Sequence, residues 1–259
     1  IVKDVLRAME TKKDEQTKAG EESAAKRAKV DEANRTDTGA FTKARVEEKR
    51  TIDFKDKLYL APLTTVGNVP FRRVCKTRGA DITCGEMALC TSLLQGLPSE
   101  WALLRRHKSE DIFGVQICGG YPDSVTRCCQ LLEDTIDVDF IDINMGCPAK
   151  KVTNGYSGSA LLCDPDYALR LIAAVVDAVD VPVTLKTRLG WDDDLLNAPE
   201  VAARAEQAGI QLVTIHGRTR CQFYKGAADW AAIKSGTDAV NSPAIAHGDS
   251  VHAAPATLA

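Results

Sequence analysis

Short apolar runs alternate with amphipathic stretches from Ile52 onward. The apolar runs are rich in β-branched residues, which is typical of buried strands, and the stretches between them, such as 122–136 and 165–179, are helix-like. Because strand, helix and strand follow one another at short spacing, we expect parallel pairing with a right-handed crossover each time. The predicted strands are 58–63, 80–85, 112–118, 138–144, 181–188, 211–216 and 243–247.

This alternation predicts an α/β protein of the TIM (β/α)8-barrel type, a fold for which about 250 residues in one domain is ordinary. Helix-opening signals support it, since Pro122-Asp123-Ser124 and Asp164-Pro165 each combine a capping residue or acid with a first-turn proline. Only seven strands are counted before the sequence ends at Ala259. We therefore expect a barrel truncated after the seventh strand, with open sheet edges.

Residues 1–50 have a different character from the rest of the chain. They hold 13 Lys/Arg and 11 Asp/Glu, with Phe41 as the only aromatic residue. Such a segment buries too little apolar surface to offset the entropy lost on ordering. We expect a disordered charged tail or linker at 1–50, in preference to a basic targeting signal at 26–29, and a barrel domain at 51–259.

Composition narrows the cellular setting. Apolar residues make up 44% and charged residues 27% of the chain, the balance of a soluble globular protein, and no apolar run approaches the roughly 18 residues of a membrane span. The nine cysteines form no CxxC pair, which argues against a disulfide framework and a zinc ribbon, and Cys128-Cys129 suits core packing. We expect a monomer without membrane or metal, in the cytoplasm or alternatively the nucleus.

Polar residues end five of the predicted strands. In a barrel, residues at the carboxyl ends of successive strands converge on one pocket. The simpler explanation, that polarity begins where any strand ends, accounts for one or two such positions but less well for a lysine and a histidine after apolar runs. We predict a shared site that contains Gln116, Asn144, Lys186, His216 and His247.

Lys186 and His216 have several uses open to them. Period-two alternation puts Lys186 and Arg188 on the same side as Thr184. A buried ammonium needs an anion or an electron-rich ring, although Schiff-base chemistry is a rival use. His216 suits a base, a hydrogen-bond donor to a cofactor, a metal ligand or a structural group, and no second ligand nearby in sequence favours metal.

Two loops suit a flat phosphorylated ligand. Pro62, Leu63 and Thr64 follow the first strand, where proline and small residues let the backbone approach a ring closely. The turn His247-Gly248-Asp249 follows the seventh strand, where barrels commonly bind phosphate. Neither GxGxxG nor GxxxxGK[ST] occurs, so no separate Rossmann or P-loop domain is expected. A flavin nucleotide fits this arrangement.

Cys147 lies in a loop directly after the fourth predicted strand, within Gly146-Cys147-Pro148. Its thiol could act as a nucleophile, as a general acid or as inert packing. A nucleophile needs an activating base nearby, whereas a general acid needs only reach and a thiol that stays protonated.

Together these residues resemble the tRNA-dihydrouridine synthases, flavoprotein barrels that reduce a tRNA uridine with NADPH or NADH. The resemblance implies that FMN delivers hydride to C6 and Cys147 gives a proton to C5. It also implies that Pro62, Leu63, Thr64, Gln116, Lys186, His216 and the 247–249 turn hold FMN, while Asn144 and Arg188 contact the substrate. The matching stretches are APLTTVGNVPFRR, GVQICG, DINMGCPAKKV, GSALL, VTLKTRLGW and TIHGRTR.

The resemblance is not uniform along the chain. Residues 52–144 resemble the eukaryotic branch that modifies the tRNA variable region, whereas the later motifs resemble the bacterial branch. His247 replaces the usual Asn of the family, and residues 51–259 carry 20 basic and 25 acidic residues, so we expect weak RNA affinity from this segment. The alternative hypotheses are an FMN barrel that acts on a free pyrimidine and an RNA-binding fragment without catalytic competence.

Overall fold

The computed structural model describes residues 49–249. The predicted tail at 1–50 therefore lies outside the described residues, apart from Lys49 and Arg50. Lys49 is buried, and its ammonium donates hydrogen bonds to the backbone carbonyls of Val176 and Val179 at the end of a helix. This contact joins the start of the described segment to the barrel.

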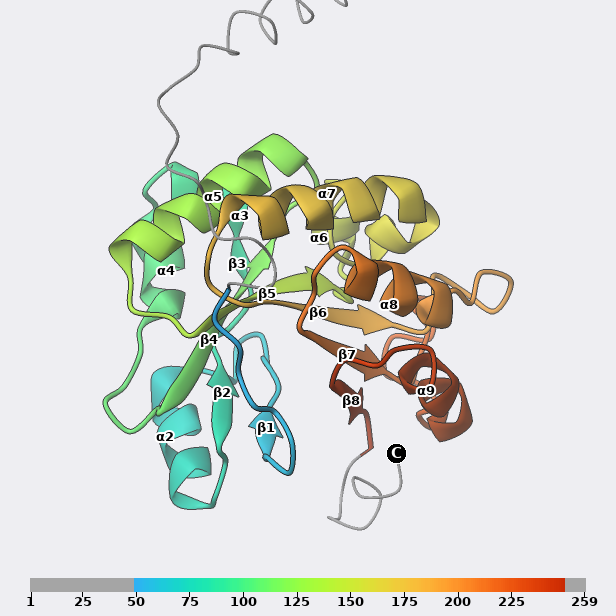
Figure 1. Cartoon of the computed structure of the whole chain (residues 1–259), viewed down its shortest axis with the longest axis horizontal. Coiled ribbons are helices and arrows are strands. Elements are labelled where there is room, and N and C mark those ends of the chain that lie inside the picture. The colour runs from blue at the N-terminus through green and yellow to red at the C-terminus, as the bar shows by residue number, and fades with distance from the viewer. Residues whose placement is uncertain (1–48, 250–259) are drawn as a thin grey trace, which may run out of the picture. The chain divides into compact units, whose positions relative to one another are not determined.

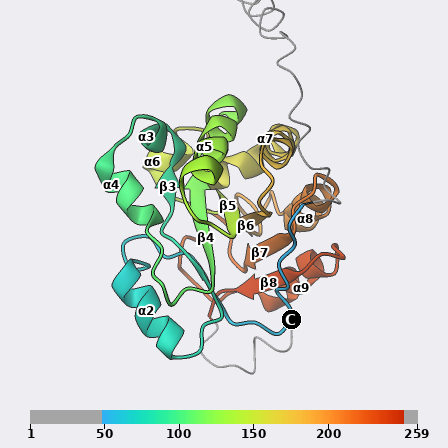
Figure 2. The same cartoon turned by 60° about the vertical axis from the view of Figure 1, so that its left-hand side comes forward.

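A single parallel sheet organises the described residues (Figure 1). Its neighbours follow the order β1-β2-β4-β5-β6-β7-β8, and the short β3 pairs beside β4. The sheet curls, with helices on its outer side (Figures 1 and 2). The strands are β1 (Tyr59–Leu60), β2 (Ile82–Cys84), β3 (Ala88–Leu89), β4 (Ile112–Cys118), β5 (Phe140–Met145), β6 (Val183–Arg188), β7 (Leu212–His216) and β8 (Ala244–His247).

This architecture confirms the predicted α/β class and the TIM-type barrel with seven main strands. Each predicted run overlaps one observed strand, although β5 ends one residue beyond its run, and among the described residues β1 and β8 pair on one side only. The prediction missed β3, because a two-residue strand leaves no alternation to detect. It also overestimated β1, which stops at Leu60 before the Pro62 turn.

The helices begin where the sequence signals predicted. Asp164 caps α7 by accepting a hydrogen bond from the backbone N–H of Tyr167 at 3.0 Å. Pro122 is in the first turn of α5, although its cap residue Tyr121 makes no side-chain bond. None of the described helices has the length and apolar character of a membrane crossing. The helices are α2 (Val69–Thr77), α3 (Cys90–Leu94), α4 (Pro98–Trp101), α5 (Pro122–Thr135), α6 (Lys150–Thr153), α7 (Pro165–Ala178), α8 (Ala198–Gln207) and α9 (Trp230–Thr237), with 3₁₀ turns η2 (Ala102–Leu104) and η3 (Gly158–Cys163).

Two apolar clusters lie on opposite sides of the sheet. The larger one fills the space between strands and helices and includes Leu185, Cys128 and Cys129, which confirms the predicted packing role of this cysteine pair. The smaller one lies inside the curled sheet, where the rings of Phe54 and Phe140 meet edge to face with centroids 6.2 Å apart. Apolar side chains fill the interior of the curled sheet near the start of β5. The polar residues that face the interior lie nearer the carboxyl end of this strand.

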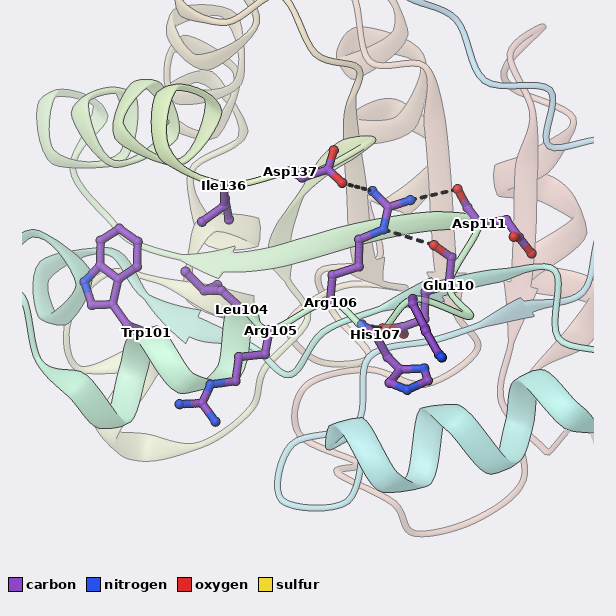
Figure 3. A pocket seen from close by; sticks show the side chains of 10 residues that line it. Trp101, Leu104, Arg105, Arg106, His107, Glu110, Asp111, Ile136 and Asp137 are labelled. Atoms are coloured by element: carbon purple, nitrogen blue, oxygen red, sulfur yellow. Dashed lines mark hydrogen bonds and ion pairs between the residues drawn. The ribbon is translucent and has the colours of Figure 1, made fainter.

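A separate pocket of about 780 Å³ lies beside the loop that precedes β4 (Figure 3). Arg106 crosses it and pairs with Asp137 at 3.1 Å and with Asp139 at 2.8 Å. The same guanidinium donates to the backbone carbonyls of Glu110 and Asp111. The arginine is thus used in holding this loop against the start of β5.

Candidate functional site

The strand register brings the predicted strand-end residues side by side. Asn144 of β5 is level with Lys186 of β6, and His216 of β7 is level with both Arg188 and His247. Gln116 of β4 is level with Asp142, one inward position below Asn144. The predicted convergence at the carboxyl ends of β4 to β8 is therefore present.

A chain of side-chain hydrogen bonds runs across β4, β5 and β6. Thr184 Oγ1 donates to Asp142 Oδ1 at 2.6 Å, and Gln116 Nε2 donates to Asp142 Oδ2 at 2.7 Å. Asn144 Nδ2 donates to Gln116 Oε1 at 2.9 Å. The sequence reasoning missed Asp142, although its place two residues before Asn144 puts it on the same strand face.

The Cys147 loop is held from two sides. Asn144 Oδ1 accepts hydrogen bonds from the backbone N–H of Gly146 at 3.1 Å and of Cys147 at 2.8 Å. On the other side, Ser159 Oγ donates to the Cys147 carbonyl at 2.9 Å. A side chain at Gly158, where φ is +60°, would come within 2.8 Å of that carbonyl. The half-buried thiol thus sits on a fixed backbone.

Lys186 is buried without a hydrogen-bond partner for its ammonium among the described residues. Burial lowers the pKa of Lys186 to about 8, and the charge of Asp142 only partly opposes this. Burial likewise raises the pKa of Asp142, against the hydrogen bonds from Thr184 and Gln116. A lysine with this pKa stays largely protonated near pH 7, so at the carboxyl end of β6 it is suited to bind an electron-rich or anionic group.

Two histidines meet edge to face, with ring centroids 4.9 Å apart. Burial and the charges of Lys186, Arg188 and Arg218 lower the pKa of His216 to about 3. The charge of Lys186, followed by burial, lowers the pKa of His247 to about 2. Both rings are therefore neutral near pH 7, and Nδ1 of His247 is buried without a partner among the described residues.

Two arginines tie the loops around this site together. Arg188 Nε donates to the Gly146 carbonyl at 2.8 Å, and its Nη1 donates at 2.8 Å to the carbonyls of Thr219 and Phe223. Arg218 Nη1 lies 3.2 Å from His216 Nε2, which must accept because a guanidinium only donates. The sequence reasoning did not single out Arg218, although it follows His216 by two residues within TIHGRTR.

The 247–249 turn is built around a glycine. Gly248 has φ of +118°, and a Cβ there would lie 3.0 Å from the His216 ring, so another residue would be strained and crowded. Asp249 pairs with Arg218 at 2.7 Å and accepts from the backbone N–H of Ala228 at 2.7 Å. These bonds lower the pKa of Asp249 and occupy its carboxylate, so the backbone of this turn is the freer ligand.

The loop after β1 is the part of the predicted site that the structure does not join to the rest. Leu63 and Thr64 are exposed and Pro62 is half-buried, and among described residues no hydrogen bond links them to Lys186 or the histidines. The loop instead depends on Glu86 Oε2, which accepts from the backbone N–H of Thr65 at 2.6 Å. Sequence reasoning also missed Glu86, two residues beyond β2.

The residues present fit a flavin mononucleotide. Within residues 49–249, the Lys186 ammonium and the buried Nδ1 of His247 have no hydrogen-bond partner, and Arg188 and Arg218 add positive charge. These groups favour an anionic or electron-rich planar ligand with a phosphate. Within 49–249, no three His, Cys, Asp or Glu side chains gather in a way that could hold a metal ion.

Comparison with known proteins shows what the chain is similar to. The family described as dihydrouridine synthase (Dus) matches residues 59–257. A rice protein named tRNA-dihydrouridine(47) synthase [NAD(P)(+)]-like is 53% identical over 193 residues, which cover 74% of this chain and 28% of the rice protein. Its human counterpart of the same name is 48% identical, with 78% and 31% covered.

A bacterial relative is equally similar. The probable tRNA-dihydrouridine synthase of Rhodobacter capsulatus is 49% identical over 201 residues, which cover 77% of this chain and 62% of the bacterial protein. The chain thus spans under a third of the rice and human relatives and less than two thirds of the bacterial one. Similarity to both branches agrees with the mixed resemblance of its motifs.

Solved structures share the fold at low sequence identity. A putative phosphonomutase from Burkholderia cenocepacia superimposes with a TM-score of 0.51 at 19% identity, covering 78% of this chain and 83% of the other. A putative lyase/mutase from the same organism gives a TM-score of 0.51 at 18% identity, with 78% and 74% covered. At such identity these matches support the barrel architecture alone.

Proposed function

Because the chain belongs to the dihydrouridine synthase family, we propose that it forms the FMN-binding barrel of an enzyme that reduces a tRNA uridine to 5,6-dihydrouridine with NADPH or NADH. The observation that carries this proposal is that Asn144 fixes the Cys147 loop and is itself level with Lys186, at the carboxyl ends of β5 and β6. Substrate, cofactor and reductant all belong to the proposal.

FMN would be held along the carboxyl ends of the strands. Lys186 would meet the electron-rich edge of the ring, His216 and the 247–249 turn the phosphate side, and the β1 loop with Gln116 would complete the pocket. The β1 residues are Pro62, Leu63 and Thr64. When bound and reduced, FMN supplies hydride to C6 of the uracil.

Cys147 would act as the general acid. Hydride addition at C6 makes C5 nucleophilic, so a proton must reach C5 from a positioned donor, and the thiol is on a loop that Asn144 fixes. Asn144 and Arg188 would contact the base. Arg188 already donates to the Gly146, Thr219 and Phe223 carbonyls and lies over the Tyr224 ring, so these contacts would hold its guanidinium in place beside the base.

Residues 51–259 would contribute little of the binding affinity for the RNA partner. Residues 51–259 carry 20 basic and 25 acidic residues, so the segment lacks the excess positive charge that polyanion binding uses. The target base must also leave its stack to reach the site. We infer a monomer that acts on tRNA in the cytoplasm or the nucleus.

The test compares Cys147→Ala with the unchanged protein. We expect the variant to keep bound flavin and NADPH oxidation but to lose dihydrouridine formation by about a hundredfold or more, as measured by mass spectrometry of digested tRNA. Unchanged product yield would remove Cys147 from the reaction. Cys163→Ala is the matched control, because Cys163 is exposed at the end of η3 and outside the proposed machinery.

A second experiment tests the cofactor. Lys186→Ala should weaken flavin retention through gel filtration, followed by absorbance, and full retention would contradict the role given to Lys186. Supplying free uracil in place of tRNA identifies the substrate class. Turnover of free uracil, with none of tRNA, would overturn the proposal in favour of a free-pyrimidine reductase.

A further inference from the structure

We propose that Asp142 is a positioning residue that sets the direction of the Gln116 and Asn144 amides and thereby holds the Cys147 backbone in place. This inference rests on the proposed function only in naming Cys147 as the proton donor. Its geometry lies entirely in described residues.

The hydrogen bonds are all donated in one direction, from the thiol loop toward the carboxylate in the barrel interior. Gln116 Nε2 donates to Asp142 at 2.7 Å, and Gln116 Oε1 accepts from Asn144 at 2.9 Å. The remaining oxygen of Asn144 accepts from the backbone N–H of Cys147 at 2.8 Å and of Gly146 at 3.1 Å. Each amide uses its nitrogen toward Asp142 and its oxygen toward Cys147.

Asp142 enforces this direction because both of its oxygens accept, one from Gln116 and the other from Thr184. If the Gln116 amide turned over, its oxygen would face a carboxylate oxygen and its nitrogen would face the donor nitrogen of Asn144. Asn144 would then have to turn as well and present its nitrogen to the Cys147 N–H. Asp142, Gln116 and Asn144 are 1%, 2% and 8% exposed, so water offers little compensation for these clashes.

Asp142 itself is anchored from the neighbouring strand. Thr184 Oγ1 donates to its second oxygen at 2.6 Å, which fixes the carboxylate against β6. The network therefore links three strands to the loop that carries the thiol. Asp142 contacts neither the thiol nor its loop. It nevertheless determines, through Gln116 and Asn144, where that loop lies.

The first experiment removes the preferred direction of the hydrogen bonds without changing the size of the side chain at position 142. Asp142→Asn presents both a donor and an acceptor, so either amide orientation becomes compatible. We expect amide hydrogen exchange at Gly146 and Cys147 to become about fivefold faster, the loss of one net hydrogen bond. Unchanged exchange would overturn the proposal.

The second experiment restores the direction of the hydrogen bonds by moving the carboxylate from position 142 to position 116. In Gln116→Glu the two adjacent carboxylates repel, and exchange at Gly146 and Cys147 should also be faster. In Asp142→Asn/Gln116→Glu, the new Asn donates to the new Glu, which still accepts from Asn144. We expect the double variant to return exchange to within about twofold of the unchanged protein. A merely structural role predicts additive damage, and that result would overturn the proposal.

Two controls complete the test. Asp139→Asn alters a carboxylate just before β5 that bonds the Phe113 N–H at 2.7 Å and pairs with Arg106, and it should leave the Cys147 amide unchanged. If circular dichroism shows the double variant unfolded, Gln116→Met decides the question. This uncharged replacement should also speed exchange at Gly146 and Cys147, and unchanged exchange would overturn the proposal.

Exchange requires neither flavin nor tRNA, so it separates this inference from the proposed function. In turnover, Asp142→Asn should lower kcat about tenfold while KM for tRNA stays within about twofold, because misplacement affects the proton transfer more than binding. If dihydrouridine forms normally and exchange is unchanged, the positioning role fails alone. If exchange responds but no variant or parent makes product, the proposed function fails alone.

Discussion

The region around the loop before β4 and the carboxyl ends of β6 to β8 both bury charged residues, but only the second leaves one of them, Lys186, without a hydrogen-bond partner among the described residues. Before β4, Arg72 pairs with Glu110 at 2.7 Å, and the side chains are 1% and 0% exposed. At the ends of β6 to β8, Lys186, Arg188 and Arg218 carry like charge, and Lys186 has no hydrogen-bond partner among the described residues.

The contrast separates charged groups that have partners within the fold from those that lack them among the described residues. Although burial opposes ionisation of Glu110, hydrogen bonds from Arg72, the His107 N–H and Thr83 lower its pKa. The strand-end cluster shows the opposite, since the pKa values of Lys186 and His216 fall away from the charged form. Groups that are satisfied in place stabilise the fold, whereas groups left without partners are available to a ligand.

The largest expected effect is on the paired side. Arg72→Met leaves Glu110 buried without its cation, and we expect the free energy of unfolding in urea to fall by about 3–5 kcal/mol. Arg72→Met/Glu110→Gln should recover much of this loss. A loss below about 1 kcal/mol in the single variant would show that the pair is not structurally important.

Lys186 should destabilise the fold when it is charged, in contrast to the paired Arg72. Its folded pKa of about 8 lies below the unfolded value, so the unfolded state binds more protons and stability rises as pH increases from 8 toward 10.5. We expect the unfolding free energy of the parent to gain about 3 kcal/mol over this window relative to Lys186→Met. Parallel pH curves for the two proteins would contradict the depressed pKa.

His247 should make the protein sensitive to acid. Its pKa is lowered to about 2, chiefly by the charge of Lys186, so protons bind the unfolded state preferentially below pH 6.5. Stability should therefore decline as pH falls from 6.5 to 4.5, and His247→Asn should reduce the slope by about 1 kcal/mol per pH unit. Urea unfolding at three pH values measures the slope, and equal slopes would argue against a neutral His247 ring in the folded protein.

The smallest effect is expected on the exposed surface. Lys234 pairs with Asp238 at 2.9 Å along α9, with both side chains about 60% exposed. Lys234→Ala should change the unfolding free energy by less than about 0.5 kcal/mol. A loss of unfolding free energy as large as that of Arg72→Met would contradict the difference proposed between buried and exposed ion pairs.

The sequence predicted the barrel well because its strands are buried on both faces. Runs such as 112–118 coincide with β4, whereas the two-residue β3 leaves no pattern. The helix starts at Pro122 and Pro165 were predicted equally well, since proline favours the first turn of a helix.

The sequence predicted that these strand ends would lie side by side, but not the hydrogen bonds that connect them. Gln116, Asn144, Lys186, His216 and His247 are found together because strand register follows from the period of two. The pairing of Arg218 with Asp249 joins residues 31 positions apart, and no local pattern encodes it. Asp142 was missed because a polar residue inside an apolar run is read as a weak strand signal until its partners are known.

The order of strands in space repeats their order along the chain, apart from the short β3. Each new strand can therefore join the edge left by the one before it, without waiting for a distant segment or inserting between strands already paired. Residues 59–145 would supply β1 to β5 while later residues are still inside the ribosome, and assembly during translation could proceed one unit at a time.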